Sequence, residues 1–328
     1  MTDSFSGPRS ESVGDAAVRR ASPLGVAHLV WGPLGPEPLR RFLRSHREHP
    51  AGAEHELVIL LNNVAESQRP ELLAELEGVP HRLLVMPEPV QDLAAYAQAA
   101  RVLEHERLCF VNSHSEILAP DWLAKLVRAL DRPQTGLVGA TGSWGSQRSH
   151  LLHDRRLPSP YRSVFPNRRW MQEQFLAIDR ERFGEPTRLP RLRRQLNTSR
   201  ATIEAVAGFD SFPAPHLRTT AFLVDRQLFV SLNPSGRRLR RKVHAFALES
   251  GRHSYTRQVQ RLGLRVLVVD REGACYEPEQ WDRSETFWQA AQAGLLVADN
   301  QTRRYECGDR DRKLLLARFA WGARAIVP

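Results

Sequence analysis

The chain has 328 residues, which at roughly 100 to 200 residues per domain allows one large domain or two modest ones. Hydrophobic residues make up 41% and charged residues 26% of the chain, with 20 Gly and 22 Pro, so the composition excludes a disordered, collagen-like or short fibrous protein. The formal net charge of +10 favours anionic partners such as nucleotide phosphates, nucleic acid or a negatively charged membrane face, without choosing among them.

The cysteines and the N-terminus bear on the compartment. Cys109, Cys275 and Cys307 are widely spaced and form no C-x-x-C pair, which argues against a disulfide framework or a structural zinc site. No apolar run approaches the roughly 18 to 20 residues that cross a bilayer, and the first residues carry acids and serines where a signal peptide is apolar. We therefore expect a cytoplasmic protein.

Residues 1–24 are polar and rich in Gly, Ser and Pro, and we expect a disordered leader there. Short apolar runs then alternate with amphipathic stretches. The apolar runs cover 26–31, 56–62, 82–87, 107–112 and 136–140, and the amphipathic stretches between them cover 36–49, 70–78, 91–105 and 120–130. Strands buried on both faces read as continuous apolar runs, and parallel strands need helical crossovers. The first 140 residues therefore predict a doubly wound α/β sheet.

The second half of the chain is less regular. Residues 142–215 hold many Pro and Arg without periodicity, which indicates a long surface excursion of the kind that often carries binding residues. Regular patterns return at 219–232 and 242–250, with a helix expected over 253–263 and a strand over 264–270. A last helix, from about residue 309, has an apolar and a basic face, which suits packing on its own domain or lying on a membrane surface.

Polar residues follow several of the predicted strands. Trp31 follows the first, Asn62 and Asn63 the second, and Asn112-Ser113-His114-Ser115-Glu116 the fourth. In open α/β sheets ligands bind beyond the carboxyl ends of the strands, so these residues are candidates for a ligand site. The alternative is that the asparagines cap helices or form turns.

Three segments resemble inverting family-2-type glycosyltransferases with the GT-A fold. RLCFVNSHSEILAPDWLAKLVRAL resembles the strand, Asp-x-Asp motif and helix of that family, TTAFLVDRQLF its acceptor-side strand, and ALESGRHSYTRQVQRLGLRVLVVD the segment in which a Glu-Asp pair opens a helix. The resemblance implies a GT-A-like, Rossmann-like domain over 25–270 with a mostly parallel sheet flanked by helices. Its nucleotide half is expected at about 25–141 and its acceptor half at about 215–270, before a C-terminal helical extension over 271–328.

The Asp-x-Asp position departs from the family. Asn112 and His114 stand where the family carries acids, the second of which usually holds a divalent cation on the donor diphosphate. Mn²⁺ and Mg²⁺ prefer oxygen ligands, so an imidazole there weakens a metal site. Three alternatives remain open: His114 ligates a softer cation, a charged His114 or nearby arginines neutralise the diphosphate without metal, or the donor site has degenerated.

The acidic pair departs as well, since it reads Glu249-Ser250. An inverting transfer needs one base to take the acceptor proton, and the resemblance implies that Glu249 is this base. His253, one turn further on, either orients Glu249 or simply faces water. Among the arginines we expect Arg218 and Arg252, and the group from Arg237 to Arg241, to meet phosphate. The alternative for Glu249 is an exposed glutamate at a helix N-terminus.

Rival interpretations come from other motifs. GATGSWG at 139–145 looks like a nucleotide-binding turn of a reductase, but it follows the fifth strand and no Tyr-x-x-x-Lys accompanies it. Trp144, Tyr161, Phe165 and Trp170 lie among arginines, as in polyanion-binding proteins, yet no nucleic-acid motif accompanies them and we expect no nucleic-acid partner. A degenerate protein that binds a sugar nucleotide or glycan without turnover remains the main alternative.

We expect a glycosyltransferase that moves a sugar from a nucleotide-sugar donor to a glycan or lipid-linked acceptor with inversion. The donor is expected to contact Trp31, Asn62, Asn63, Asn112 and His114, with His114 as the candidate metal ligand. The family link implies polysaccharide biosynthesis in the cytoplasm, with peripheral attachment to the inner membrane face left open.

Overall fold

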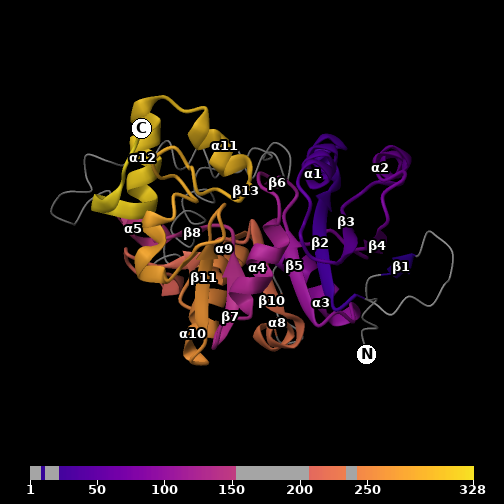
Figure 1. The fold of residues 1–328 in the computed structure, drawn as a ribbon, viewed down its shortest axis with the longest axis horizontal. Coiled ribbons are helices and arrows are strands. Elements are labelled where there is room, and N and C mark those ends of the chain that lie inside the picture. The colour runs from indigo at the N-terminus through magenta and orange to yellow at the C-terminus, as the bar shows by residue number, and fades with distance from the viewer. Residues whose placement is uncertain (1–8, 12–21, 153–206, 234–241) are drawn as a thin grey trace, which may run out of the picture.

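The strands and helices of the first 140 residues alternate as the hydrophobic periodicity predicts. A computed structural model describes residues 9–11, 22–152, 207–233 and 242–328 (Figure 1). Its first elements are β1 (Arg9–Glu11), β2 (Leu24–Trp31), α1 (Glu37–Glu48), β3 (Glu56–Asn62), α2 (Arg69–Glu75), β4 (Arg82–Val85), α3 (Asp92–Val102), β5 (Arg107–Val111), β6 (Glu116–Ile117), α4 (Trp122–Leu130) and β7 (Thr135–Gly139). Each of the five predicted strands and four predicted helices is present.

The later elements are β8 (Gly142–Ser143), α5 (Gln147–Leu152), β9 (His216–Leu217), β10 (Ala221–Asp225), α8 (Arg226–Leu232), α9 (Lys242–Ser250), α10 (Tyr255–Arg261), β11 (Arg265–Val269), β12 (Cys275–Tyr276), β13 (Val297–Ala298), α11 (Asn300–Glu306) and α12 (Arg310–Trp321). The expected helix over 253–263 and strand over 264–270 are therefore confirmed as α10 and β11. Most of the irregular stretch 142–215 lies outside the described residues, as do Tyr161, Phe165, Trp170 and the arginines from Arg237 to Arg241.

One nine-stranded sheet runs through the described residues, in the order β1-β4-β3-β2-β5-β10-β7-β11-β12. Strands β4, β3, β2 and β5 are parallel neighbours, and β11 is parallel to β7. Successive side chains of a strand point to opposite faces, so the apolar runs feed two separate cores. The expected fold class, an α/β sheet that is mostly parallel and flanked by helices, is confirmed.

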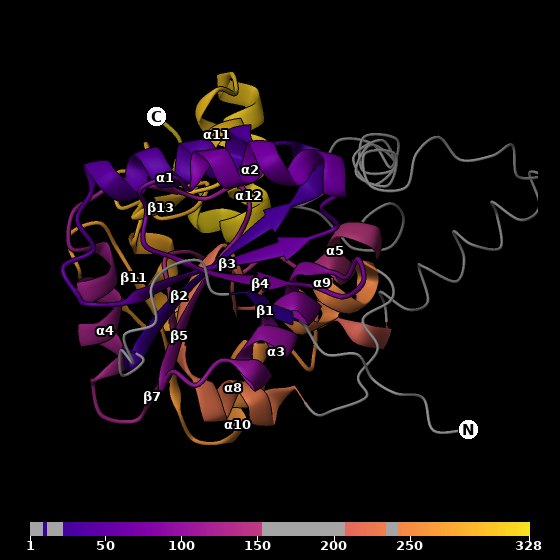
Figure 2. The same cartoon turned by 90° about the vertical axis from the view of Figure 1, so that its right-hand side faces the viewer.

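Helices cover both faces of this sheet (Figure 2). Helices α1, α2 and α4 pack with one set of strand residues, and α3, α8, α9 and α10 pack with the alternate set. Val58 and Leu60 lie in the second core, whereas Leu57 and Ile59 lie in the first. Burying an apolar side chain contributes roughly 1.5 to 3 kcal/mol, so the alternation within each strand fixes both layers.

Strand β10 runs antiparallel between β5 and β7. Its first residue, Ala221, lies opposite Val111, the last residue of β5. The beginning of an antiparallel strand lies at the edge where its parallel neighbours end. The residues just before β10 are therefore brought to the same edge as the turn after β5.

The C-terminal segment is woven into this fold. Strand β12 pairs with β11, and β13 pairs with β6. Trp321 of α12 is 1% exposed and its ring lies 5.5 Å from that of Trp144, in a T-shaped arrangement. The final helix thus packs on the rest of the chain, and the segment over 271–328 shares the core of the residues before it.

Two features differ from expectation. Within the stretch expected to be a disordered leader, Arg9–Glu11 form strand β1 against β4, and β2 begins at Leu24. Residues 1–8 and 12–21 of the leader lie outside the described residues. No helix in the described part of the chain has the length and apolar character that a membrane crossing requires.

Candidate functional site

The candidate residues at the ends of β2 and β3 have different surroundings: Trp31 and Asn62 are the last residues of these strands, and Asn63 follows β3. Trp31 lines a small hollow together with Leu34, Pro38 and Ser113, so the ends of β2 and β5 are neighbours. Asn62 is fully buried. Its side-chain Nδ2 donates to the carbonyl of Val90 (2.8 Å), and its Oδ1 accepts from the backbone amide of Val90 (3.1 Å). Asn62 therefore holds the loop between β4 and α3. Asn63 is exposed and left-handed (φ 55°), as the turn interpretation expects.

The residues after β5 form a tight turn. The side-chain oxygen Oδ1 of Asn112 accepts from the backbone amide of His114 (2.9 Å) and from Oγ of Ser115 (3.0 Å). The backbone amide of Asn112 donates to the carbonyl of Thr220 (2.9 Å), and Oγ of Ser115 donates to the same oxygen (3.2 Å). The turn is thus fastened to the residue just before β10.

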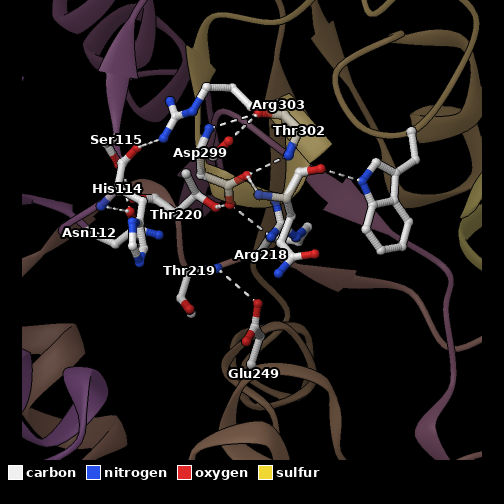
Figure 3. A network of polar contacts seen from close by, with 12 residues as sticks. Asn112, His114, Ser115, Arg218, Thr219, Thr220, Glu249, Asp299, Thr302 and Arg303 are labelled. Carbon is white, nitrogen blue, oxygen red and sulfur yellow. Dashed lines mark hydrogen bonds and ion pairs between the residues drawn. The ribbon is translucent and has the colours of Figure 1, made fainter. Parts of the chain in front are cut away.

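Glu249, on helix α9, lies at the same edge of the sheet as the turn after β5 (Figure 3). Its Oε1 accepts a hydrogen bond from the backbone amide of Thr219 (3.3 Å), next to the Thr220 that holds Asn112. Two adjacent residues therefore connect the turn after β5 with Glu249. The structure brings together the two parts that the resemblance singles out, although they are 137 residues apart in the sequence, 249 minus 112.

Burial raises the pKa of Glu249 above its ordinary value. Arg218 opposes that rise in pKa, whereas Asp92 and Asp299 add to it. A carboxylate whose pKa lies nearer to neutrality is a better proton acceptor once ionised, because general-base efficiency rises with basicity. The surroundings of Glu249 thus suit a general base.

The expectation that Glu249 opens a helix is wrong. It lies in the last turn of α9, because the helix-forming residues Ala245 to Leu248 continue the helix to Ser250. The helix stops at Gly251, where an added Cβ would lie 2.5 Å from the carbonyl oxygen of Ala247 and 2.8 Å from that of Gly208. This close approach of backbone requires glycine two residues after Glu249.

Arg218 and Asp299 form the centre of the buried network. Arg218 Nη2 lies 2.9 Å from Asp299 Oδ2, and the two side chains are 12% and 2% exposed. Oδ2 also accepts from the Thr220 hydroxyl (2.7 Å), while Oδ1 accepts from the backbone amides of Gln301 and Thr302. The Arg218 guanidinium lies 3.9 Å above the centre of the Phe287 ring. Despite its burial, the pKa of Asp299 is lowered, because these donors and Arg218 stabilise the ionised form.

Arg303 of α11 reaches the turn after β5 from the opposite side. Its Nη1 donates to Glu116 (3.0 Å) and its Nη2 to the carbonyl of His114 (2.8 Å). The pairing of β13 with β6 places α11 there, since Ala298 lies opposite Glu116. The C-terminal segment therefore contributes both Asp299 and Arg303 to this edge of the sheet.

The residues at this edge do not fit a Mn²⁺ or Mg²⁺ site. Such ions require several oxygen ligands, usually including carboxylates. Asn112 Oδ1 already accepts two hydrogen bonds, Glu116 is paired with Arg303, and both oxygens of Asp299 are occupied. Within residues 9–11, 22–152, 207–233 and 242–328, no group of three His, Cys, Asp or Glu side chains has the geometry to hold a metal. The carboxylates of Glu116 and Asp299 are thus already engaged by Arg303 and Arg218.

His253 and Arg252 lie away from this network. His253 is exposed, and its Nδ1 is 3.3 Å from Nη1 of Arg261. Arg252 forms an ion pair with Asp210 (3.1 Å), and both side chains are about two-fifths exposed, at 43% and 39%. In the described part of the chain neither residue forms a hydrogen bond or an ion pair with Glu249. Their places in the turn between α9 and α10 suit polar contacts at the surface.

The glycine-rich run at 139–145 is filled by the protein's own side chains. A Cβ on Gly142 would lie 2.6 Å from the Trp281 ring, and Trp144 donates its indole N–H to the carbonyl of Pro278 (2.7 Å). The run continues as β8, which pairs with β9, rather than leading directly into a helix. Its surroundings therefore favour packing over a dinucleotide site.

Sequence reasoning missed Asp299, Arg303, Thr220 and Asp92. The pattern Asp299-Asn-Gln-Thr302 does announce the start of a helix, because an Asp before a helix accepts its free amides. Nothing in that pattern shows which edge of the sheet the helix meets. Asp92, at the start of α3, is similarly revealed as a neighbour of Glu249 only through its effect on that residue's pKa.

Comparisons with known proteins give fold likeness alone. No family model matches the chain. An "uncharacterized protein y4gI" of Sinorhizobium fredii is 32% identical over 87 residues, which cover 26% of this chain and 10% of that protein. The chain thus spans a small part of this curated relative.

Similar solved structures are glycosyltransferases with low sequence identity. A mannosyltransferase from Pyrobaculum calidifontis, in complex with GDP-Man and Mn²⁺, is 13% identical over 80% of this chain and 60% of its own, with a TM-score of 0.41. Glucosyl-3-phosphoglycerate synthase from Mycobacterium tuberculosis, with Mn²⁺ and UDP, is 12% identical over 64% and 57% of the two chains, with a TM-score of 0.31. At these TM-scores the likenesses do not bear on function, and the fold assignment rests on the strand order.

Proposed function

We propose that this protein transfers a sugar from a nucleotide-sugar donor to a hydroxyl group of an acceptor, with inversion at the anomeric carbon. The observation that carries the proposal is the joint position of the turn after β5 and Glu249, connected through Thr219 and Thr220. The resemblance of three separate segments to inverting GT-A glycosyltransferases supports it. In that family a donor diphosphate and a catalytic base meet at this edge of the sheet.

The proposed reaction is a single displacement. The carboxylate of Glu249 takes the proton of the acceptor hydroxyl while the acceptor oxygen forms a bond to the anomeric carbon. The bond from that carbon to the diphosphate oxygen breaks, and its electron pair leaves on the nucleoside diphosphate. A positioned base contributes roughly 10² to 10⁴ in rate, so Glu249 is the residue on which turnover depends most.

The donor side of the proposal uses the edge formed by β2 and β5. Trp31 and Ser113 line one hollow there, and Asn63, Asn112 and His114 lie at the ends of adjacent strands or the turn that follows. An aromatic ring beside polar groups suits a nucleoside. In this arrangement Asn62 acts indirectly, by holding Val90 in the neighbouring loop.

The acceptor side of the proposal lies around Arg218 and Glu249. A glycan or a lipid-linked sugar has the hydroxyl group that the reaction requires. The family link places such an enzyme in polysaccharide biosynthesis in the cytoplasm, and a lipid-linked acceptor would bring it to the inner membrane face. Both remain part of the proposal.

A second candidate function is binding without turnover. This function is favoured by the closed turn after β5, because the side-chain oxygen of Asn112 already accepts hydrogen bonds from His114 and Ser115 rather than from a ligand. A chain that has lost donor chemistry would still recognise a sugar nucleotide or a glycan. The two candidates differ in one observable, the release of nucleoside diphosphate.

The test is a panel of UDP- and GDP-sugars, each with Mn²⁺, Mg²⁺ or EDTA. Melting temperature reports binding, because a ligand that binds only the folded state stabilises it. Release of nucleoside diphosphate reports turnover, and NMR of the product reports the anomeric configuration. Stabilisation with turnover and inversion supports the transferase, stabilisation alone supports the binding protein, and retention of configuration would exclude the proposed single displacement.

A further inference from the structure

Two guanidinium groups occupy the edge of the sheet where the resemblance implies a metal ion. Arg303 lies across the turn after β5 and binds both the Glu116 carboxylate and the His114 carbonyl. These two contacts hold the side chain in place, and because it is 25% exposed, solvent reaches part of it. Figure 3 shows it reaching from α11 toward His114, on the other side of Asp299 from Arg218.

Arg218 has a buried donor for which the described residues provide no acceptor. Its Nη2 is taken by Asp299, whereas its Nη1 is buried and has no hydrogen-bond partner among the described residues. A buried donor without an acceptor loses its hydrogen bond to water and gains none in return, and natural proteins rarely leave one unmet. Asp299 and the Phe287 ring fix the group in place. Arg218 is thus held ready for an acceptor atom that the described residues do not supply.

A third arginine adds to the positive charge. Arg41 of α1 repels Arg303, and this repulsion, after burial, contributes to lowering the pKa of Arg303. Glu37 lies 3.7 Å from Arg41 and compensates its charge only in part, since solvent reaches both side chains, which are 34% (Arg41) and 55% (Glu37) exposed. An anion between the arginines would relieve the repulsion.

We infer that this edge binds the diphosphate of its ligand through Arg218 and Arg303, without a divalent cation. The inference rests on the proposed function for the identity of the ligand, a nucleoside diphosphate. A guanidinium carries five donors in a fork that matches phosphate oxygens, and each arginine here uses only some of them in the contacts described above. Glu116 and Asp299 hold the two forks in position. Pre-placed donors of this kind stabilise the negative charge that develops on a leaving diphosphate.

The same arrangement explains why no carboxylate stands at 112 or 114. A metal-dependent site needs acids to hold the cation, which then neutralises the phosphates. Here the acids nearest to the turn hold arginines instead, and the arginines supply the positive charge directly. An additional carboxylate in the turn would repel the diphosphate.

The experiment measures binding of inorganic pyrophosphate, UDP and GDP to the full chain by isothermal titration calorimetry, in EDTA and in Mn²⁺. Arg303→Gln and Arg218→Gln are compared with the charge-preserving Arg303→Lys and Arg218→Lys. Arg107→Gln is the matched control, because Arg107 is also paired with an acid (Asp131, 2.6 Å) but lies at the opposite end of β5. Circular dichroism of each variant confirms that it folds.

We expect wild-type binding in EDTA that Mn²⁺ does not strengthen. Each Gln variant is expected to bind at least tenfold more weakly, each Lys variant to retain part of the affinity, and Arg107→Gln to match the wild type. Binding that requires Mn²⁺, or equal affinity in the Gln variants and the wild type, would overturn the inference. If the Arg218→Gln protein does not fold, Arg303→Gln still decides the question.

The outcome separates this inference from the proposed function. If the wild type binds pyrophosphate in EDTA but transfers no sugar, the anion site is supported and the proposed transferase function is contradicted. If it transfers sugar only with Mn²⁺, the transferase function is supported and the metal-free site is contradicted. Turnover in EDTA that falls in Arg303→Gln but not in Arg107→Gln supports both.

Discussion

Arg218 and Asp299 form a buried ion pair across 81 residues of sequence, with Nη2 of the arginine 2.9 Å from Oδ2 of the aspartate. The pair ties the C-terminal segment to the residues that precede β10. Thr220 shares the same carboxylate oxygen, and its carbonyl holds the turn after β5. Thr219, between them, donates to Glu249. The buried contact between Arg218 and Asp299 therefore connects the turn after β5, the proposed base and the C-terminal helices.

Replacement of Glu249 by Gln is expected to lower sugar transfer by about 10² to 10⁴, because the amide cannot accept the acceptor proton. The fold should persist, since Gln preserves the size of the side chain and loses only a carboxylate whose pKa burial has already raised. Initial rates of nucleoside diphosphate release measure the effect, with Glu104→Gln, an exposed glutamate, as the control. Equal rates in Glu249→Gln and the wild type would remove Glu249 from the catalytic role.

Replacement of Asp299 by Asn is expected to shift the pH profile of activity. Asp299 raises the pKa of Glu249, whereas Arg218 lowers it. Burial and Asp92 still raise the pKa of Glu249 without the aspartate charge, but the contribution of Asp299 is lost, so this pKa falls. Because the base works only when ionised, the acidic limb of kcat/KM should move to lower pH.

The same variant should be less stable, since breaking a buried ion pair typically costs about 3 to 5 kcal/mol. Thr302→Val is the matched control, because it removes hydrogen bonds to the backbone of Asp299 while leaving its charge in place. That control is expected to lose stability without moving the pH profile. If the acidic limb of the kcat/KM profile is at the same pH in Asp299→Asn and the wild type, Glu249 is not the titrating group.

Buried histidines make the stability depend on pH. Burial lowers the pKa of His28 to about 3 and that of His46 and His216 to about 4, from 6.5 in the unfolded chain. Below pH 6.5 the unfolded chain takes up protons that the folded chain does not. The free energy of unfolding should therefore fall as pH drops from about 6.5 toward 4, by up to about 1.4 kcal/mol per pH unit for each fully buried histidine.

Urea unfolding at several pH values measures this slope. His28 stacks on Phe42 with ring centroids 3.9 Å apart and its two ring nitrogens have no partner among the described residues, so His28→Leu should fold and flatten the slope. Leu29→Met, at the adjacent buried position of β2, cannot titrate and serves as the control. A slope that is unchanged in His28→Leu would contradict the assignment.

Replacement of Gly251 by Ala is expected to destabilise the protein and to displace Glu249. The new Cβ would meet two backbone carbonyl oxygens, which cannot move aside as a flexible side chain does. Overpacking of this kind typically costs about 1 to 3 kcal/mol. Thermal unfolding and the transfer rate should both decline.

Gly208→Ala tests the specificity of that effect, because a Cβ at 208 would meet nothing within 4 Å. The control is expected to change the unfolding free energy by less than about 0.5 kcal/mol. If both variants behaved alike, the close approach at Gly251 would not be the reason for the glycine.

Hydrophobic periodicity predicted the strands and helices of the first 140 residues, because burial on both faces leaves continuous apolar runs such as the one over 56–62. It also placed Trp31, Asn112 and His114 at strand ends or just beyond. It could not distinguish Asn62, which holds Val90, from a ligand-binding asparagine, since both follow a strand in the same way. The stretch 242–250 does match α9, but the sequence did not show that Glu249 lies in the last turn of this helix, next to the turn at Gly251 that meets the backbone of Gly208.

The sequence by itself determined the α/β class, the order of its elements and the two stretches from which the candidate site is built. Only the tertiary structure decided that β10 enters the sheet antiparallel, and so brings Thr219 and Thr220 between Asn112 and Glu249. It also decided that Asp299 and Arg303 meet that edge, through the pairing of β13 with β6. Periodicity reports which face of an element is buried, but not the distant element that covers it, because contacts between segments far apart in the sequence leave no local pattern.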